Sequence, residues 1–183
     1  NKMYQDNIPL PIIRFFYNWL NNRTATAKIN SHLSRQVPLH SGVPQGSVLS
    51  PLLWIYYLGD CPCLQDPHVE IVLFADDIAI WVTHPNQTKN ISLFQKAIVD
   101  LTTWASDKRL LFNATKTNII AFHPEKKKRL KIQENTIYLY KNQDTPLAWT
   151  DSATFLGILF SSNCSFEAHL HNKISTCKAR IMQ

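Results

Sequence analysis

The sequence predicts a mixed α+β fold, in which short strand hairpins and amphipathic helices follow one another. In residues 24–37 apolar and polar side chains alternate, and a polar turn at Asn30 separates the two halves, as expected for a hairpin. In residues 69–83 two runs rich in Val, Ile, Phe and Trp meet at Asp76 and Asp77, which predicts a second hairpin. Apolar residues recur at helical spacing in residues 12–20, 48–57, 91–105 and 166–182. This combination of elements favours the α+β class.

The stretches between these elements are expected to be loops and shorter strands. Residues 48–57 are almost wholly apolar, so we expect the helix there to be buried. Residues 110–122 are expected to pass from a loop into a strand, and residues 137–147 and 154–160 to supply further strands. The basic run at residues 126–129 has two interpretations, a solvated loop tip or a contact to phosphate groups.

The composition indicates a globular protein with a basic surface. Of the 183 residues, 45% are hydrophobic and 17% are charged, which allows a substantial core. The 19 Lys and Arg outnumber the 13 Asp and Glu, giving a net charge of +6 that favours a polyanionic partner such as nucleic acid. No apolar run approaches membrane-spanning length, so we expect no membrane partner. Without a signal peptide we expect an intracellular protein.

The adjacent carboxylates Asp76 and Asp77 are candidate metal ligands. Side chains of neighbouring residues on a regular strand point to opposite faces, but a tight turn at Ala75-Asp76-Asp77 lets both approach one point. Hard cations such as Mg²⁺ prefer carboxylate oxygens and keep water and phosphate oxygens as further ligands. The hairpin therefore predicts a divalent-metal site, with an exposed Asp-Asp turn of no special function as the alternative.

A second candidate site lies in residues 40–51, which contain two of the four glycines of the chain, Gly42 and Gly46. Glycine permits close approach of the backbone to a ligand, and Pro44 stiffens the loop between them. A loop of this kind that opens a helix can hold phosphates or bases near the helix N-terminus.

The order of these motifs resembles the reverse transcriptases of non-LTR retrotransposons, most closely those of jockey-like elements. The resemblance rests on the loop that runs from Ser41 to Pro51, followed by the box Phe74-Ala75-Asp76-Asp77. Residues 113–117 and 155–158 fall where that family has its next two motifs. The resemblance extends from about Pro11 to the C-terminus.

This resemblance implies a right-hand polymerase palm, an antiparallel sheet backed by helices, at residues 1–157, followed by the start of a helical thumb at residues 158–183. It implies an RNA template, a DNA primer and deoxynucleoside triphosphates as partners, and Mg²⁺ or Mn²⁺ as cofactor. Nuclear and cytoplasmic location follows from the same resemblance, whereas the oligomeric state does not.

The resemblance also implies a role for each motif. Asp76 and Asp77 would bind the catalytic metals, and Lys116 would lie near the nucleotide phosphates and protonate the leaving pyrophosphate. The remaining roles are template and nucleotide binding by Ser41, Gly42, Pro44, Gln45 and Gly46, and primer binding by Phe155, Leu156 and Gly157.

Three departures from the family pattern lead to an alternative function. The family's other metal-binding Asp would lie before Asn1, so we expect this chain alone to lack polymerase activity. Ile55 stands where the family usually has Asn, and Ile78 where a small polar residue is common. The alternative is therefore a non-catalytic nucleic-acid-binding remnant or a repurposed copy of such a domain.

Overall fold

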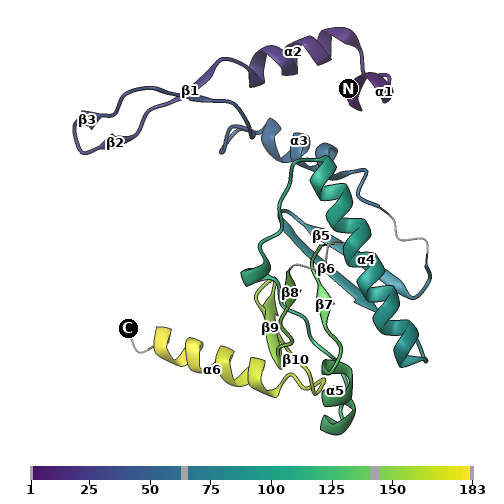
Figure 1. Cartoon of the computed structure of the whole chain (residues 1–183). Coiled ribbons are helices and arrows are strands. Elements are labelled where there is room, and N and C mark those ends of the chain that lie inside the picture. The colour runs from purple at the N-terminus through teal and green to yellow at the C-terminus, as the bar shows by residue number, and fades with distance from the viewer. Residues whose placement is uncertain (1, 63–65, 141–144, 182–183) are drawn as a thin grey trace. The chain divides into compact units, whose positions relative to one another are not determined.

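The computed structural model describes residues 2–62, 66–140 and 145–181, and the chain divides into two compact units, residues 1–60 and 61–183 (Figure 1). Helices and short antiparallel strand pairs occur in the same chain, which confirms the predicted α+β class. Among the described helices, none combines the length and apolarity that a membrane span requires.

The first unit consists of three helices and a long, narrow hairpin. Its helices are α1 (Lys2–Gln5), α2 (Leu10–Leu20) and α3 (Leu49–Leu58). The hairpin has two ladders, one pairing β1 (Arg23–Ala25) with β4 (Val37–Leu39) and the other pairing β2 (Lys28–Ile29) with β3 (His32–Leu33). This confirms the hairpin predicted for residues 24–37.

The second unit is built on one long helix, α4 (Gln87–Asp107), which contacts both strands of the hairpin β5 (Val69–Phe74) and β6 (Asp77–Val82). The Asn86 side chain accepts a hydrogen bond from the Lys89 amide and so caps the N-terminus of α4, as Asn commonly does. The remaining elements of this unit are the 3₁₀ helix η1 (Ala114–Lys116), α5 (Lys126–Gln133), β7 (Ile137–Tyr138), β8 (Pro146–Leu147), β9 (Ser152–Phe155), β10 (Ile158–Ser161) and α6 (Glu167–Ile181).

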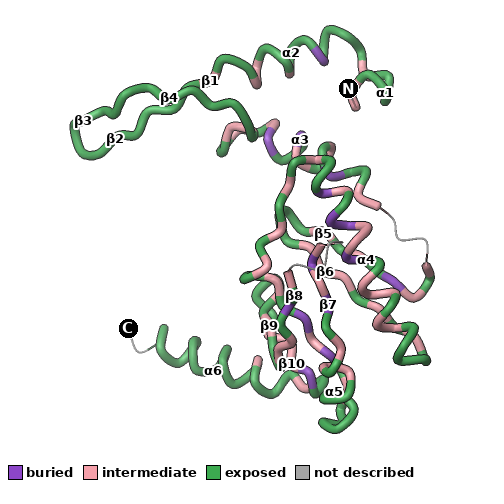
Figure 2. The backbone as a smooth tube through the Cα atoms, in the orientation of Figure 1, coloured by how far each residue is buried: buried purple, intermediate pink, exposed green. Residues whose placement is uncertain are grey.

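The core of the second unit forms where α4 meets β7 and β8. Its buried members are Ile98, Ile119, Ile137, Leu139 and Leu147. Ile80 of β6 and Ala114 of η1 pack against this cluster, so the core supports both the carboxylate hairpin and η1. Buried residues recur along α4 (Figure 2), as the apolar stripe from residue 91 to residue 105 predicts.

Three expectations from the sequence are corrected. Residues 110–122 form no regular strand but only an isolated bridge between Ile119 and Trp149, because Asn113 and Thr117 bond locally to the backbone and so favour a turn. The basic run at 126–129 is the first turn of α5 rather than a loop tip, since Lys and Arg are good helix formers.

The third correction concerns α3, which is not buried throughout. Leu53 and Leu58 are buried, whereas Leu52 and Ile55 are 59% and 67% exposed. A nearly continuous apolar sequence does not decide which side chains are covered, because burial depends on the neighbours that the fold supplies. The described strands also pair as five separate two-stranded antiparallel sheets rather than as one larger sheet.

Candidate functional site

The two carboxylates lie at the tip of a regular hairpin. Strands β5 and β6 pair over six residues each, from Val69 opposite Val82 to Phe74 opposite Asp77. The loop between them is therefore only Ala75 and Asp76, and Ala75 has a positive φ of 52°. This confirms the predicted tight turn, with Asp76 in the loop and Asp77 as the first residue of β6.

Both carboxylates are exposed, and neither forms an ion pair or side-chain hydrogen bond with a described residue. Two exposed, unneutralised carboxylates at one turn fit a hard divalent cation by their chemistry. Within the described part of the chain, no group of three His, Cys, Asp or Glu residues could hold a metal. Asp76 and Asp77 can thus supply part of a metal site, and other ligands would have to complete it.

The loop at residues 41–47 is shaped by its glycines and held by side chains from both ends. Gly42 and Gly46 have φ values of +78° and +82°, and a Cβ atom on either would meet no atom within 4 Å. These positions therefore favour glycine for its backbone freedom rather than for space. The hydroxyl of the buried Ser50 donates to the Pro44 carbonyl over 2.5 Å, which ties the loop to the first turn of α3.

Arg23 fixes the other end of this loop. Its Nε donates to the Leu20 carbonyl (2.7 Å), and its Nη2 donates to the carbonyls of Gly42 (2.6 Å) and Ser41 (3.4 Å). The guanidinium thus joins the C-terminal end of α2 to the loop. A pocket of about 490 Å³ opens beside this clamp, lined by Arg23, Leu39, Ser41, Pro44 and Gln45 among others.

Lys116 ends η1, and its side chain is exposed. Asn113 accepts hydrogen bonds from the Thr115 amide (3.0 Å) and hydroxyl (2.7 Å), so this short turn has a defined shape. Because Ala114 packs on the core that also holds Ile80 of β6, the segments that carry Lys116 and the carboxylates rest on one common support.

Phe155, Leu156 and Gly157 form the turn between β9 and β10. Phe155 pairs with Ile158, so Leu156 and Gly157 make a two-residue loop, and both have positive φ, 50° and 79°. This is the backbone sign that a type I′ hairpin turn requires. Leu156 is 47% exposed at its tip.

The predicted site residues are thus divided between the units. Ser41, Gly42, Pro44, Gln45 and Gly46 share one loop of the first unit, whereas the other predicted residues lie on turns of the second. No role is predicted for Arg23 from the sequence. Its position just after α2 is nevertheless a local signal, because an Arg near the end of a helix can donate to the terminal carbonyls of that helix.

Comparisons with known proteins agree with the motif order. The family profile described as "Reverse transcriptase (RNA-dependent DNA polymerase)" matches residues 2–160. No solved structure matches the chain significantly.

The curated relatives are transposon proteins of Drosophila melanogaster. The chain is 23% identical to "Probable RNA-directed DNA polymerase from transposon X-element", over 97% of the chain and 19% of that relative. It is 26% identical to the corresponding protein "from transposon BS", over 96% of the chain and 19% of the relative. It is also 28% identical to "RNA-directed DNA polymerase from mobile element jockey", over 57% of the chain and 12% of the relative.

The chain therefore spans about a fifth or less of the length of these relatives. The predicted resemblance to jockey-like retrotransposon enzymes is confirmed. Since the profile covers most of the chain, including every predicted site residue, the chain belongs to the reverse transcriptase (RNA-dependent DNA polymerase) family.

Proposed function

We propose that the protein is the RNA-directed DNA polymerase of a non-LTR retrotransposon, which extends a DNA primer with deoxynucleoside triphosphates on an RNA template. The observation that carries this proposal is the carboxylate hairpin. A six-pair ladder holds Asp76 and Asp77 at an exposed turn, within a segment that matches the reverse transcriptase profile. In line with the family resemblance, we propose a nuclear and cytoplasmic location.

In this proposal residues 1–157 form part of a polymerase palm, and residues 158–183 begin the thumb. The packing of α4 against β5 and β6 supports the palm assignment, because a palm presents its carboxylates on strands backed by helices. The helix α6 (Glu167–Ile181), which contacts β10, would be the first thumb helix.

Mg²⁺, or Mn²⁺ in its place, would be held by Asp76 and Asp77 together with water, phosphate oxygens and residues outside the described part of the chain. When bound, such ions stabilise the negative charge on the attacking and leaving oxygens of phosphoryl transfer. The role of the hairpin is to hold two carboxylates at a fixed turn, which supplies positioning rather than covalent chemistry.

The other motifs would bind the substrates. Pro44, Gln45 and Gly46, next to the pocket beside Arg23, would contact the template and the incoming nucleotide. The Lys116 ammonium would lie near the nucleotide phosphates and give its proton to the leaving pyrophosphate. The turn at Leu156 and Gly157 would support the primer end.

A second candidate function is a nucleic-acid-binding remnant without polymerase activity. The departures from the family pattern at Ile55 and Ile78 favour this alternative, and Ile78 directly follows the proposed metal ligand Asp77. Nucleic-acid binding would then persist with a steep salt dependence, whereas primer extension would be absent.

The test is primer extension by the full-length protein across a Mg²⁺ titration, with Asp76→Asn and Asp77→Asn compared. Asp76→Asn keeps the shape of the side chain but removes its charge, so we expect extension to fall by about 10³-fold or more. We expect Asp77→Asn to be less severe, because Asp77 already belongs to β6, where alternation limits its access to a common point.

Glu70→Gln is the matched control, since Glu70 is an exposed carboxylate on β5 of the same hairpin and its replacement removes the same charge. Thermal unfolding of each variant separates loss of activity from loss of fold. Extension by Asp76→Asn at the wild-type rate would remove the metal site from the proposal. Extension absent from the wild-type protein would favour the remnant.

A further inference from the structure

The first unit has only two acidic residues in its sequence, Asp6 and Asp60, and both belong to one polar cluster. The Lys2 ammonium lies 3.8 Å from a carboxylate oxygen of Asp60, and the Tyr56 hydroxyl donates a hydrogen bond to Asp6. Lys2 begins α1, and Asp6 follows its last residue, whereas Tyr56 and Asp60 lie in α3 and just after it. The cluster therefore ties α1 to the C-terminal end of α3, across 50 to 54 positions of sequence.

Lys2 is the centre of this cluster. Its ammonium donates to the Tyr56 carbonyl over 2.5 Å and lies 4.6 Å from the centroid of the Tyr56 ring, which is a cation–π contact. Carbonyls in the last turn of a helix lack partners within the helix and attract positive charge. The Lys2 side chain is only 25% exposed, so these contacts hold it in a defined place.

The cluster completes a closed series of contacts through the first unit, called the frame below. Helix α1 contacts α2, and Arg23, just after α2, bonds the Gly42 carbonyl. At the other end of the loop at residues 41–47, Ser50 in the first turn of α3 bonds the Pro44 carbonyl. The cluster then joins the C-terminal end of α3 back to α1. Contacts that close such a frame support one another, because each holds the partners of the others close together.

We propose that Lys2 and Tyr56 are positioning residues of the polymerase, which hold α3 so that the loop at residues 41–47 keeps the shape that binds template and nucleotide. This rests on the proposed function, which gives the loop that role. Neither residue touches a substrate, since both act through α3 and the buried Ser50. A helix of ten residues is a rigid element that can transmit a displacement along its length. Release of α3 at its C-terminal end therefore loosens the loop at its N-terminal end.

The first test is hydrogen exchange on the 183-residue chain, measured at the amides of Ser47 and Ser50, which donate to the carbonyls of Pro44 and Ser47. Tyr56→Phe removes the hydroxyl but keeps the ring next to Lys2, and Lys2→Met removes the ammonium but keeps an unbranched side chain. We expect exchange at these amides to accelerate about 5-fold in Tyr56→Phe and about 10-fold in Lys2→Met.

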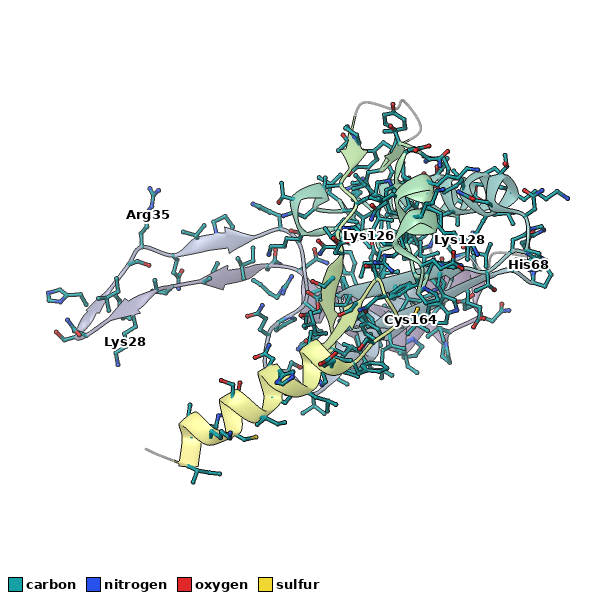
Figure 3. All side chains as sticks on the ribbon, turned by 90° about the horizontal axis from the view of Figure 1, so that it is seen from below. Lys28, Arg35, His68, Lys126, Lys128 and Cys164 are labelled. Atoms are coloured by element: carbon teal, nitrogen blue, oxygen red, sulfur yellow. The ribbon has the colours of Figure 1, made fainter. Side chains whose placement is uncertain are left out.

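Two variants are matched controls. Tyr4→Phe removes a hydroxyl from an exposed position of α1. Lys28→Met removes one positive charge from the hairpin of the first unit, where Lys28 is exposed and projects from the strand (Figure 3). Both should leave the exchange of Ser47 and Ser50 unchanged, and thermal unfolding of every variant checks that the fold is retained.

A double variant separates the frame from independent stabilisation of its helices. When Arg23→Ala has already opened the frame, Tyr56→Phe should accelerate exchange by less than about 2-fold. Independent contributions would instead multiply, and Tyr56→Phe would give the same factor in both backgrounds.

The second test uses primer extension by the full-length protein. We expect Tyr56→Phe and Lys2→Met to raise the KM for nucleotide by about 5-fold and about 10-fold, with kcat lowered by less than about 2-fold. A cluster that only stabilises the fold would reduce the fraction of active enzyme, which lowers the apparent kcat and leaves KM unchanged.

Three results would overturn the proposal. The first is unchanged exchange in both Tyr56→Phe and Lys2→Met. The second is an equal effect of Tyr56→Phe with and without Arg23→Ala. The third is a lower kcat at constant KM. Absence of primer extension by the wild-type full-length protein would instead overturn the polymerase function, and the exchange measurements would still decide whether the frame holds the loop.

Discussion

Replacement of Arg23 by Ala should release the loop at residues 41–47. The guanidinium makes short hydrogen bonds to the carbonyls of Leu20 and Gly42, at 2.7 and 2.6 Å, and a weaker one to Ser41 at 3.4 Å. Hydrogen bonds to charged groups contribute about 1.5–3 kcal/mol each. Because Arg23 is partly exposed, we expect the clamp as a whole to contribute about 2 kcal/mol, which is a factor of about 30 in the population of the detached loop.

Hydrogen exchange measured by mass spectrometry reads this population directly. The amides of Ser47 and Ser50 donate to the carbonyls of Pro44 and Ser47, so their exchange should accelerate by about the same factor of 30 in the variant. Arg14→Ala, on an exposed position of α2, removes an equal charge and should leave this exchange unchanged. Unaltered exchange in Arg23→Ala would refute the clamp. In the full-length protein the same variant should raise the KM for nucleotide more than it lowers kcat. The reason is that nucleotide binding would then also have to order the detached loop, which lowers the affinity.

Three further predictions concern stability. Gln95 bonds both the amide and the carbonyl of Tyr138 at 2.8 Å, so Gln95→Ala should lower the free energy of unfolding by about 2 kcal/mol, measured by urea denaturation with the exposed Lys96→Ala as control. The Tyr56 hydroxyl donates a hydrogen bond to the Asp6 carboxylate. The pKa of Tyr56 is raised from 10.0 to about 12, mainly by this bond and to a smaller extent by burial and by the negative charges of Asp6 and Asp60. The stability that the Tyr56–Asp6 hydrogen bond contributes is therefore fully present below pH 10 and lost as pH rises through about 12. Titration of the tyrosinate absorbance should show one tyrosine that ionises late in the wild-type chain, and this late ionisation should be absent in Asp6→Ala. Leu156 has a φ of 50°, so Leu156→Asn should raise the thermal midpoint by relieving about 1 kcal/mol of backbone strain, whereas a lower midpoint would contradict that reasoning.

The sequence predicts those elements whose signals are local. The turn at Asp76 and the helix over residues 91–105 follow from periodicity and strand propensity, and both are present. The Arg23 clamp joins residues 18 and 19 positions apart, and the bonds from Gln95 to Tyr138 span 43 positions. No local pattern encodes such contacts, because they depend on which elements meet after the chain has folded.

The backbone at the two hairpin tips also departs from what sequence propensity favours. Hairpin turns with positive φ normally use Gly, Asn or Asp, yet Ala75 and Leu156 hold φ values of 52° and 50°. Each costs about 1 kcal/mol or more relative to Gly, and the adjoining ladders of six and four residue pairs must offset that cost. The tips are therefore shaped by their strands rather than by the preferences of their own residues. Strain of this kind is commonly retained at functional positions, and here it occurs at the two turns that carry the proposed metal and primer residues. The tip that holds Asp76 should consequently lose its geometry if the β5–β6 ladder is weakened, even when Asp76 itself is unchanged.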